Sequence, residues 1–213
     1  MNIVERARKL FGELGSLEEA EKIRIINQIK QELHEHSPFR HEPTDCVIWV
    51  PADEVEANDY NPNIVAPPEM RLLKLSILED GYTQPIVAYR DNDHYEVIDG
   101  FHRNRIGKES KEVRGRIKEH LPLTIINAER EGRCDRIAAT IRHNRARGKH
   151  QVGGMSDIVQ ELSRRNWGEK RIAKELGMEP DEVLRLKQIT GLAEMFANEE
   201  FSEAWEAVKE EMR

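Results

Sequence analysis

The hydrophobic pattern of this 213-residue chain changes period twice, and these changes restrict the fold more than any single motif does. Residues 45–128 contain short β-branched and aromatic runs separated by segments rich in proline, asparagine, aspartate and glycine, which is typical of strands and turns. On both sides, apolar residues recur every three or four positions, as on one face of a helix. The sequence therefore predicts an α+β fold with a small mixed sheet between helical regions.

We divide the chain into an N-terminal helical arm (1–40), a mixed-sheet domain (41–130) and a helical region (131–213). In the arm, Ser16 and Glu19 have the spacing of a capping box, and Pro38 follows the predicted end of the helix. Between them runs one apolar stripe of Ile23, Ile26, Ile29 and Leu33. This stripe either packs on the sheet domain or pairs with a second copy of the chain, as in a homodimer.

Within the sheet domain we predict strands at 46–50, 85–89, 94–98 and 121–128. A helix is predicted over residues 69–77, ending at Gly81, and another after residue 100. A further amphipathic helix is predicted to close the chain, with Phe196, Phe201, Trp205 and Val208 on its apolar side.

Composition excludes several classes of protein. No apolar run approaches the roughly 20 residues of a membrane span, and the first residues lack the basic start and apolar core of a signal peptide. Two cysteines are too few for a disulfide scaffold or a four-thiolate zinc site, and the histidines show no ligand-like grouping. We therefore expect a cytoplasmic protein with reduced thiols, no membrane association and no bound transition metal.

Charge is distributed unevenly, although the net charge is -7. Residues 130–187 hold 14 Lys and Arg against 9 Asp and Glu, whereas residues 188–213 hold 2 against 7. A basic stretch followed by an acidic tail is a pattern to test for an anionic partner.

The predicted strand-to-helix turn at residues 99–103 has the composition of an anion site. Gly100 tolerates positive φ and lets the backbone approach a ligand, and a following helix would point amide hydrogens at an anion. His102, Arg103 and Arg105 add side-chain donors, and an arginine can grip a phosphate through two parallel bonds. The alternative is an ordinary turn with solvated basic residues.

A resemblance to a known family rests on the order of several motifs: residues 61–63, 69–70, 76–77, 81–87 and 98–103. Together they resemble the ParB/sulfiredoxin-like domain, and most of all the phage- and plasmid-borne ParB-like proteins of the IbrB type. The superfamily includes chromosome- and plasmid-partition proteins, sulfiredoxins and a kinase that acts on free serine. The resemblance covers about residues 40–130. It implies a nucleoside triphosphate, ATP or CTP, bound with or without Mg²⁺ at the turn, where Gly100, His102 and Arg103 match. Phe101 occupies the position of the sulfiredoxin cysteine, so sulfiredoxin chemistry is excluded.

A second motif of partition proteins, Glu-Asn-x-x-Arg, would fall at residues 143–147. Asn144 and Arg147 match it, but His143 replaces the glutamate that the family uses to hold magnesium. Imidazole is a poor ligand for Mg²⁺, so this replacement is compatible with nucleotide binding and argues against metal-assisted hydrolysis. A basic solvated helix face would explain the same residues without any ligand.

Residues 163–187 predict two helices around a tight turn. Gly177 would end the first helix and Pro180 would begin the second, with Ile172, Ala173, Leu176, Val183 and Leu186 facing inward. As a helix-turn-helix, this segment would contact DNA phosphates and a base edge through Lys170, Arg171, Lys174, Arg185 and Lys187. Asp181 and Glu182 at the start of the second helix oppose close base contact, and a plain helical hairpin is the alternative.

Three functions are compatible with this sequence. The leading hypothesis is a nucleotide-binding, ParB-like DNA-binding protein with a role in transcription regulation, for which the resemblance implies a partner related to PAPS reductases. The second is a phosphoryl-transfer enzyme, an NTPase, free-serine-kinase-like enzyme or nuclease, with Asp99 and Glu69 as base or metal ligand. The third is a protein-interaction module with a vestigial pocket, which His143 in place of glutamate favours.

Overall fold

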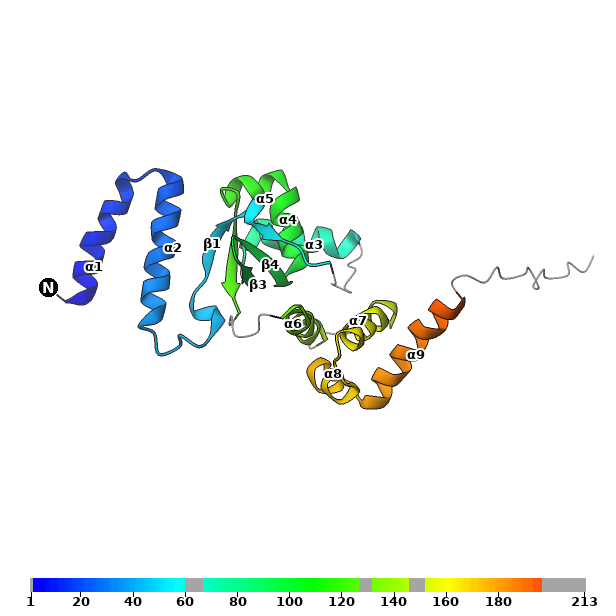
Figure 1. The fold of residues 1–213 in the computed structure, drawn as a ribbon. Helices are drawn as coiled ribbons and strands as arrows, with labels where there is room; N and C mark the ends of the chain where they lie inside the picture. The colour runs from blue at the N-terminus through cyan, green and yellow to red at the C-terminus, as the bar shows by residue number, and fades with distance from the viewer. Residues whose placement is uncertain (1, 60–66, 127–131, 146–151, 197–213) are drawn as a thin grey trace, which may run out of the picture. The chain divides into compact units, whose positions relative to one another are not determined.

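The structure is a computed structural model that describes residues 2–59, 67–126, 132–145 and 152–196, with the side chains of 144–145, 152–153 and 190–196 outside the description. The chain forms two compact units, residues 1–147 and residues 148–213 (Figure 1). The predicted closing helix falls mostly on residues 197–213, outside the described residues.

A five-stranded mixed sheet forms the centre of the first unit, as the sequence predicts (Figure 1). Its strand order is β1-β5-β3-β4-β2. The strands are β1 (Ile48–Pro51), β2 (Val55–Glu56), β3 (Ile86–Asp91), β4 (His94–Asp99) and β5 (His120–Ile125). β1 and β5 run antiparallel, as do β3 and β4, whereas β3 with β5 and β2 with β4 are parallel. The sequence did not predict β2, whose two residues are too few to show a strand pattern.

Helices cover both faces of this sheet. On one face, α3 (Pro67–Asp80), α4 (Phe101–Glu109) and α5 (Lys111–Arg116) contribute Ile77, Ile106 and Val113 to a core shared with the strands. On the other face, Ala139 of α6 (Arg133–Arg145) packs with Tyr89 and Ile98. Val97 belongs to the first core and Ile98 to the second because successive strand residues point to opposite faces.

The N-terminal arm contains α1 (Ile3–Phe11), a 3₁₀ segment (Gly12–Ser16) and α2 (Glu19–Glu35). The predicted capping box at Ser16 and Glu19 is wrong. Ser16 ends the 3₁₀ segment, and its Oγ donates to the Glu13 carbonyl at 2.8 Å, while Glu18 precedes α2 without a side-chain cap. The capping box belongs to α1, where the Asn2 side chain accepts from the Glu5 amide and the Glu5 side chain accepts from the Asn2 amide, both at 2.8 Å.

Helix α2 is attached to the edge strand β1 by side-chain bonds to the backbone. Asn27 donates to the Trp49 carbonyl at 2.6 Å and accepts from the Trp49 amide at 2.9 Å. Trp49 faces Pro122 across β1 and β5, and proline has no amide hydrogen to donate. Asn27 therefore satisfies both backbone groups of Trp49 at the edge of the sheet, and Lys30 adds a 2.9 Å bond to the Val47 carbonyl. Intramolecular contact of the arm, one of the two predicted alternatives, is thus present.

The second unit contains α7 (Val152–Arg164), α8 (Glu169–Leu176) and α9 (Pro180–Phe196). Gly177 ends α8 in the left-handed region with φ 64°, and the Met178 amide donates to the Ala173 carbonyl at 2.8 Å. Pro180 begins α9, as predicted. The five residues predicted to face inward are all buried: Ile172, Ala173, Leu176, Val183 and Leu186. The predicted helix-turn-helix is therefore formed by α8 and α9.

Candidate functional site

The turn between β4 and α4 requires glycine at position 100. Gly100 has φ 94°, a conformation that side chains rarely adopt. A Cβ at this position would lie 3.0 Å from Nη2 of Arg103 and 3.3 Å from the Cα of Ile86, so the space is also filled. Gly100 offers no capping side chain to α4, and the first turn of that helix contains no acidic residue. No carboxylate in the first turn of α4 therefore compensates the positive end of the helix dipole.

Arg103 folds back across this turn. Its Nη1 donates to Oε1 of Gln84 at 2.6 Å, and its Nη2 lies 3.4 Å from Oδ2 of Asp99. The Arg103 and Asp99 side chains are only 11% and 5% exposed, so the guanidinium is oriented beside the glycine rather than extended into solvent. The hydroxyl of Tyr82 donates to the Arg103 carbonyl at 2.8 Å, and burial raises the pKa of Tyr82 to about 12, so this donor stays protonated.

Gln84 belongs to this site, although the sequence analysis did not propose it as a site residue. It directly precedes Pro85 and the strand β3. Because β3 and β4 are antiparallel, with Val87 opposite Asp99, the start of β3 lies beside the end of β4. The predicted hairpin was the signal from which this proximity could have been inferred.

His102 is partly buried beside an aromatic ring. Neither ring nitrogen has a hydrogen-bond partner among the described residues, and the ring contacts Phe101 edge to face at 5.4 Å between centroids. Burial, and secondarily the charge of Arg105, lowers the pKa of His102. The imidazole is therefore neutral near pH 7 and does not contribute a positive charge to the turn.

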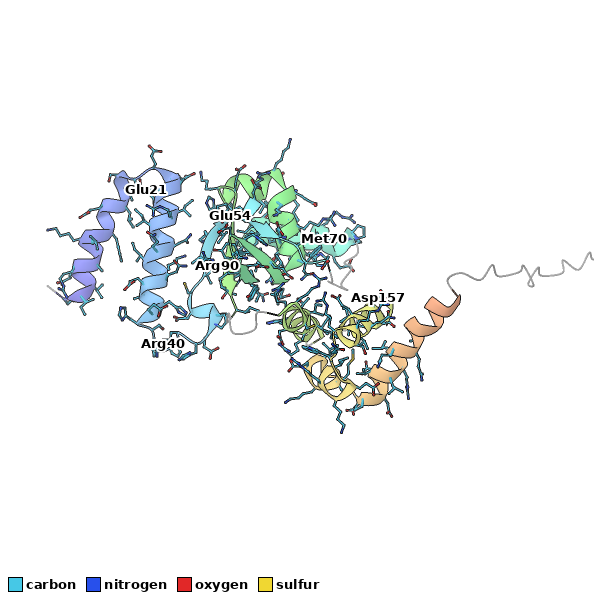
Figure 2. All side chains as sticks on the ribbon, in the orientation of Figure 1. Glu21, Arg40, Glu54, Met70, Arg90 and Asp157 are labelled. Carbon is cyan, nitrogen blue, oxygen red and sulfur yellow. The ribbon has the colours of Figure 1, made fainter. Side chains whose placement is uncertain are left out.

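Arg105 makes its contacts away from Arg103. Arg105 is exposed, and its Nε donates to both carboxylate oxygens of Glu109 at 3.0 Å. It lines a separate cavity of about 450 Å³ between α3 and α4, together with Met70, labelled in Figure 2. Residues two positions apart on a helix do not share a face, which explains the separation of Arg103 and Arg105.

The two carboxylates proposed for catalysis occupy different environments. Asp99 is buried against Arg103, whereas Glu69 is exposed on the first turn of α3. Within the part of the chain that the structure describes, no group of three or more His, Cys, Asp or Glu side chains could hold a metal ion. A catalytic role for either carboxylate stays a prediction.

The second family motif begins in the last turn of α6, which contains His143 and Asn144. The Asn144 side chain and the whole of Arg147 lie outside the described residues. Their proposed place in a nucleotide pocket stays a prediction.

Four of the five residues predicted to contact DNA are exposed: Lys170, Arg171, Lys174 and Arg185. The guanidinium carbon of Arg171 lies 3.8 Å from the centre of the Trp167 ring, a cation–π contact that orients this side chain. Lys187 differs, because its Nζ forms a 3.1 Å ion pair with Oε1 of Glu169.

Comparisons with known proteins agree with both parts of this description. Residues 40–129 match the ParB N-terminal domain, and residues 150–198 match the IbrB-like C-terminal HTH domain. The chain is 54% identical over 193 residues to the uncharacterized protein YbdM of Escherichia coli strain K12, which covers 90% of this chain and 91% of that protein.

Among solved structures, the chain is similar to the chromosome-partitioning protein ParB from Caulobacter crescentus. The complex of that protein with CTP-gamma-S is 17% identical, covers 70% of this chain and 83% of the other, and has a TM-score of 0.38. Its complex with the centromeric parS site is 15% identical, covers 70% and 75%, and has a TM-score of 0.45. Sulfiredoxin from Arabidopsis thaliana is 15% identical over 37% of this chain and 82% of the other, with a TM-score of 0.30.

The sheet domain and the helix-turn-helix together define a ParB-like protein. More particularly, this chain belongs to the proteins that combine a ParB N-terminal domain with an IbrB-like C-terminal HTH domain, which confirms the ParB-like, IbrB-type family predicted from the sequence motifs. None of the described helices is both long enough and apolar enough to cross a lipid bilayer.

Proposed function

We propose that this protein is a nucleotide-responsive, DNA-binding regulatory protein. In this proposal the helix-turn-helix contacts DNA, and the turn at residues 99–103 binds a nucleoside triphosphate. The observation that carries the proposal is the helix-turn-helix itself, which buries its apolar residues and leaves four basic side chains exposed on α8 and α9.

DNA binding would use the two helices differently. In a helix-turn-helix the second helix enters the major groove, so Arg185 on α9 is positioned to read a base edge. Lys170, Arg171 and Lys174 on α8 would contact phosphates, and the stacking of Arg171 on Trp167 reduces the ordering cost of that contact.

Nucleotide binding would use the guanidinium of Arg103 and the amide end of α4. A triphosphate at Gly100 would compete with Gln84 and Asp99 for the guanidinium, because a phosphate accepts the same N–H bonds. We include Asn144 and Arg147 in this pocket on the strength of the family motif. ATP and CTP are the candidate ligands, with or without Mg²⁺, and the bound nucleotide would bias how two protomers, and a PAPS-reductase-like partner, associate.

The DNA part is tested by fluorescence anisotropy of a labelled duplex between 50 and 200 mM salt. Contact with three phosphates gives a slope of log K against log salt of about -2.7, and each of Lys170→Ala and Lys174→Ala should reduce its magnitude by about 1. Lys111→Ala, on α5 of the other unit, is the matched control and should leave the slope unchanged. A binding constant that does not depend on salt contradicts the proposal.

The nucleotide part is tested separately by thermal shift with ATP and CTP, each with and without Mg²⁺. A ligand at 100 times its dissociation constant adds about 2.7 kcal/mol of stability, and Arg103→Ala should abolish that gain. No stabilisation by any of the four additions contradicts nucleotide binding but not DNA binding.

The buried contact of Asp99 with Arg103 favours phosphoryl transfer as the second candidate, since a clamped phosphate and a nearby carboxylate are parts of such a site. Turnover of ATP or CTP that Arg103→Ala abolishes, in a protein that binds no DNA, would replace our proposal with this one.

A further inference from the structure

A cavity of about 300 Å³ lies where helix α2 meets the edge of the sheet, and the proposed function does not use it. Its walls come from α2, from β1 and from the turn between α5 and β5. Pockets that hold small organic ligands begin at about this volume and have mostly apolar walls. The apolar side chains that line this cavity are Ile23, Ile26, Trp49 and Ile117.

The charged part of the lining is basic. Lys30, Arg116 and Lys118 line the cavity, and no aspartate or glutamate does so among the residues that the structure describes. Lys30 donates to the Val47 carbonyl at 2.9 Å, and Arg116 donates to the Leu78 carbonyl at 2.8 Å. Carbonyl oxygens are neutral acceptors, so these bonds orient the two cations without neutralising them. The cavity therefore combines apolar walls with a positive charge.

Lys118 has an acidic partner that a ligand can replace. Its Nζ lies 3.3 Å from Oε2 of Glu19, and the two side chains are 56% and 63% exposed. An exposed ion pair of this kind contributes little stability, and Glu19 is not part of the cavity lining. A ligand carboxylate would take the place of Glu19 at little cost.

The turn that carries Lys118 has a backbone conformation that is unusual for its residues. Lys118 and the following Glu119 have φ 53° and 58°, in the left-handed region that favours glycine. Two backbone bonds hold the turn: the Glu119 amide donates to the Arg114 carbonyl at 3.0 Å, and the Glu119 carbonyl accepts from the Ala52 amide at 2.8 Å. Strained residues of this kind concentrate at binding sites, so the turn supports a binding role for the cavity that it lines.

We propose that this cavity binds a small amphipathic anion, a carboxylate with an aromatic or short aliphatic body. The apolar body would lie between α2 and Trp49, and the carboxylate would lie beside the three basic side chains. A nucleoside triphosphate suits this lining poorly, because its sugar and phosphates are polar and would leave the apolar walls without a matching surface. Since the cavity is shared by α2 and β1, the bound ligand would also strengthen the attachment of the arm to the sheet.

Isothermal titration calorimetry of the full chain with 2-naphthoate tests the proposal, and 2-naphthol is the neutral control with the same ring system. We expect 2-naphthoate to bind at one site with a dissociation constant of about 1 mM or lower, as the size of the compound allows. 2-Naphthol should bind about tenfold more weakly, because it lacks the charge that the basic side chains attract. No binding of 2-naphthoate, or equal affinity for the two compounds, overturns the proposal.

Two pairs of variants locate the site. Ile26→Trp fills the cavity and should weaken the binding of 2-naphthoate at least tenfold, whereas Ile25→Trp, at a partly buried position of α2 outside the lining, should leave it unchanged. Lys118→Glu alters an exposed side chain and should weaken binding several-fold. Lys111→Glu makes the same charge change on α5 outside the lining and should not. Circular dichroism verifies that each variant is folded, and full binding in Lys118→Glu overturns the proposal.

Two further measurements separate this site from the proposed nucleotide site. Arg103→Ala should keep the wild-type affinity for 2-naphthoate, because Arg103 does not line this cavity. Loss of binding in Arg103→Ala together with full binding in Ile26→Trp would assign the compound to the turn at residues 99–103 and overturn the proposal. Hydrogen exchange at the Trp49 amide, which donates to Asn27, should slow when 2-naphthoate is bound, and an unchanged rate overturns the position beside β1.

Discussion

Gln84 accepts a 2.6 Å hydrogen bond from Nη1 of Arg103, and this bond joins the start of β3 to the first turn of α4. The amide oxygen is a neutral acceptor, so it orients the guanidinium without cancelling its charge. Asp99 on the other side of the guanidinium carries the only formal negative charge among these two acceptors. The side chain at position 84 therefore decides whether the Arg103 guanidinium is only oriented or is also neutralised.

Gln84→Glu should weaken nucleotide binding at least tenfold while the protein stays folded. The second carboxylate would hold Arg103 more strongly than the amide does and would repel a phosphate. Isothermal titration calorimetry with ATP and CTP measures the affinity. Gln28→Glu is the control, since Gln28 also accepts from an arginine, Arg24, but lies on α2. Equal affinities of Gln84→Glu and the wild type would show that phosphate does not use Arg103.

Gly100→Ala should lower the free energy of unfolding by about 1–3 kcal/mol, because it combines a positive φ with a filled space. Gly81→Ala separates the two causes, since Gly81 has φ 82° but nothing within 4 Å of an added Cβ. Gly115→Ala on α5 has neither problem and should be neutral or stabilising by up to about 1 kcal/mol. Urea denaturation measures the free energy of unfolding, which should be lowest for Gly100→Ala, higher for Gly81→Ala and highest for Gly115→Ala. An equal loss of stability at positions 81 and 100 would mean that the contacts of the added Cβ with Arg103 and Ile86 cost nothing.

The parts of the fold that sequence reasoning predicted correctly are those with local signals. The turn at Asn92, with φ 51°, and the glycines at 81, 100 and 177 mark the ends of their elements through their own backbone preferences. The parts it missed depend on contacts distant in sequence. Strand β2 forms because Val55 and Glu56 pair with Tyr95 and Glu96. A two-residue segment is too short to show the alternating pattern that would predict this pairing.

The same distinction applies to the candidate site. The sequence placed Gly100 and Arg103 together because the turn motif is contiguous, and their role in binding an anion stays a prediction. It did not identify the bond to Gln84, nineteen positions away, nor the ion pair that links Lys187 to Glu169 across α8 and α9. The lowered pKa of His102, which leaves the ring able to donate one hydrogen bond but without a positive charge, follows from burial, which a sequence does not display.

His102 should make the stability of the protein depend on pH. Its pKa is lowered in the folded state, so the unfolded chain binds more protons below the ordinary value of about 6.5. The stabilising effect of the neutral ring is therefore complete above that pH and is lost as the pH falls through the folded pKa. Urea midpoints between pH 7.5 and 5 should fall less steeply in His102→Phe than in the wild type. His36→Phe, at a side chain 76% exposed, should keep the wild-type slope, and parallel curves for His102→Phe and wild type would contradict the burial of this ring.

Asn27→Leu should cost about 1–3 kcal/mol, because it removes two hydrogen bonds, each contributing about 0.5–1.5 kcal/mol. The loss should be local to the edge of the sheet, so hydrogen exchange at the Trp49 amide is the direct measurement. Gln28→Leu, at the neighbouring exposed position, should leave that amide protected. If the Trp49 amide exchanges at the same rate in Asn27→Leu and the wild type, α2 does not protect β1.

Glu169→Gln should tighten DNA binding and steepen its salt dependence, a prediction that rests on the proposed function. The ion pair with Glu169 neutralises Lys187, so removing the carboxylate charge frees one cation beside the three basic residues of α8. One additional phosphate contact raises the magnitude of the slope of log K against log salt by about 1. Conversely, Lys187→Ala in the wild-type background should leave the slope unchanged and cost no more than about 1 kcal/mol of stability, as expected for a partly exposed ion pair. Anisotropy titrations of the two variants and the wild type at several salt concentrations measure this slope. A reduced slope of log K against log salt in Lys187→Ala would mean that DNA displaces Glu169 and that Lys187 contacts phosphate directly.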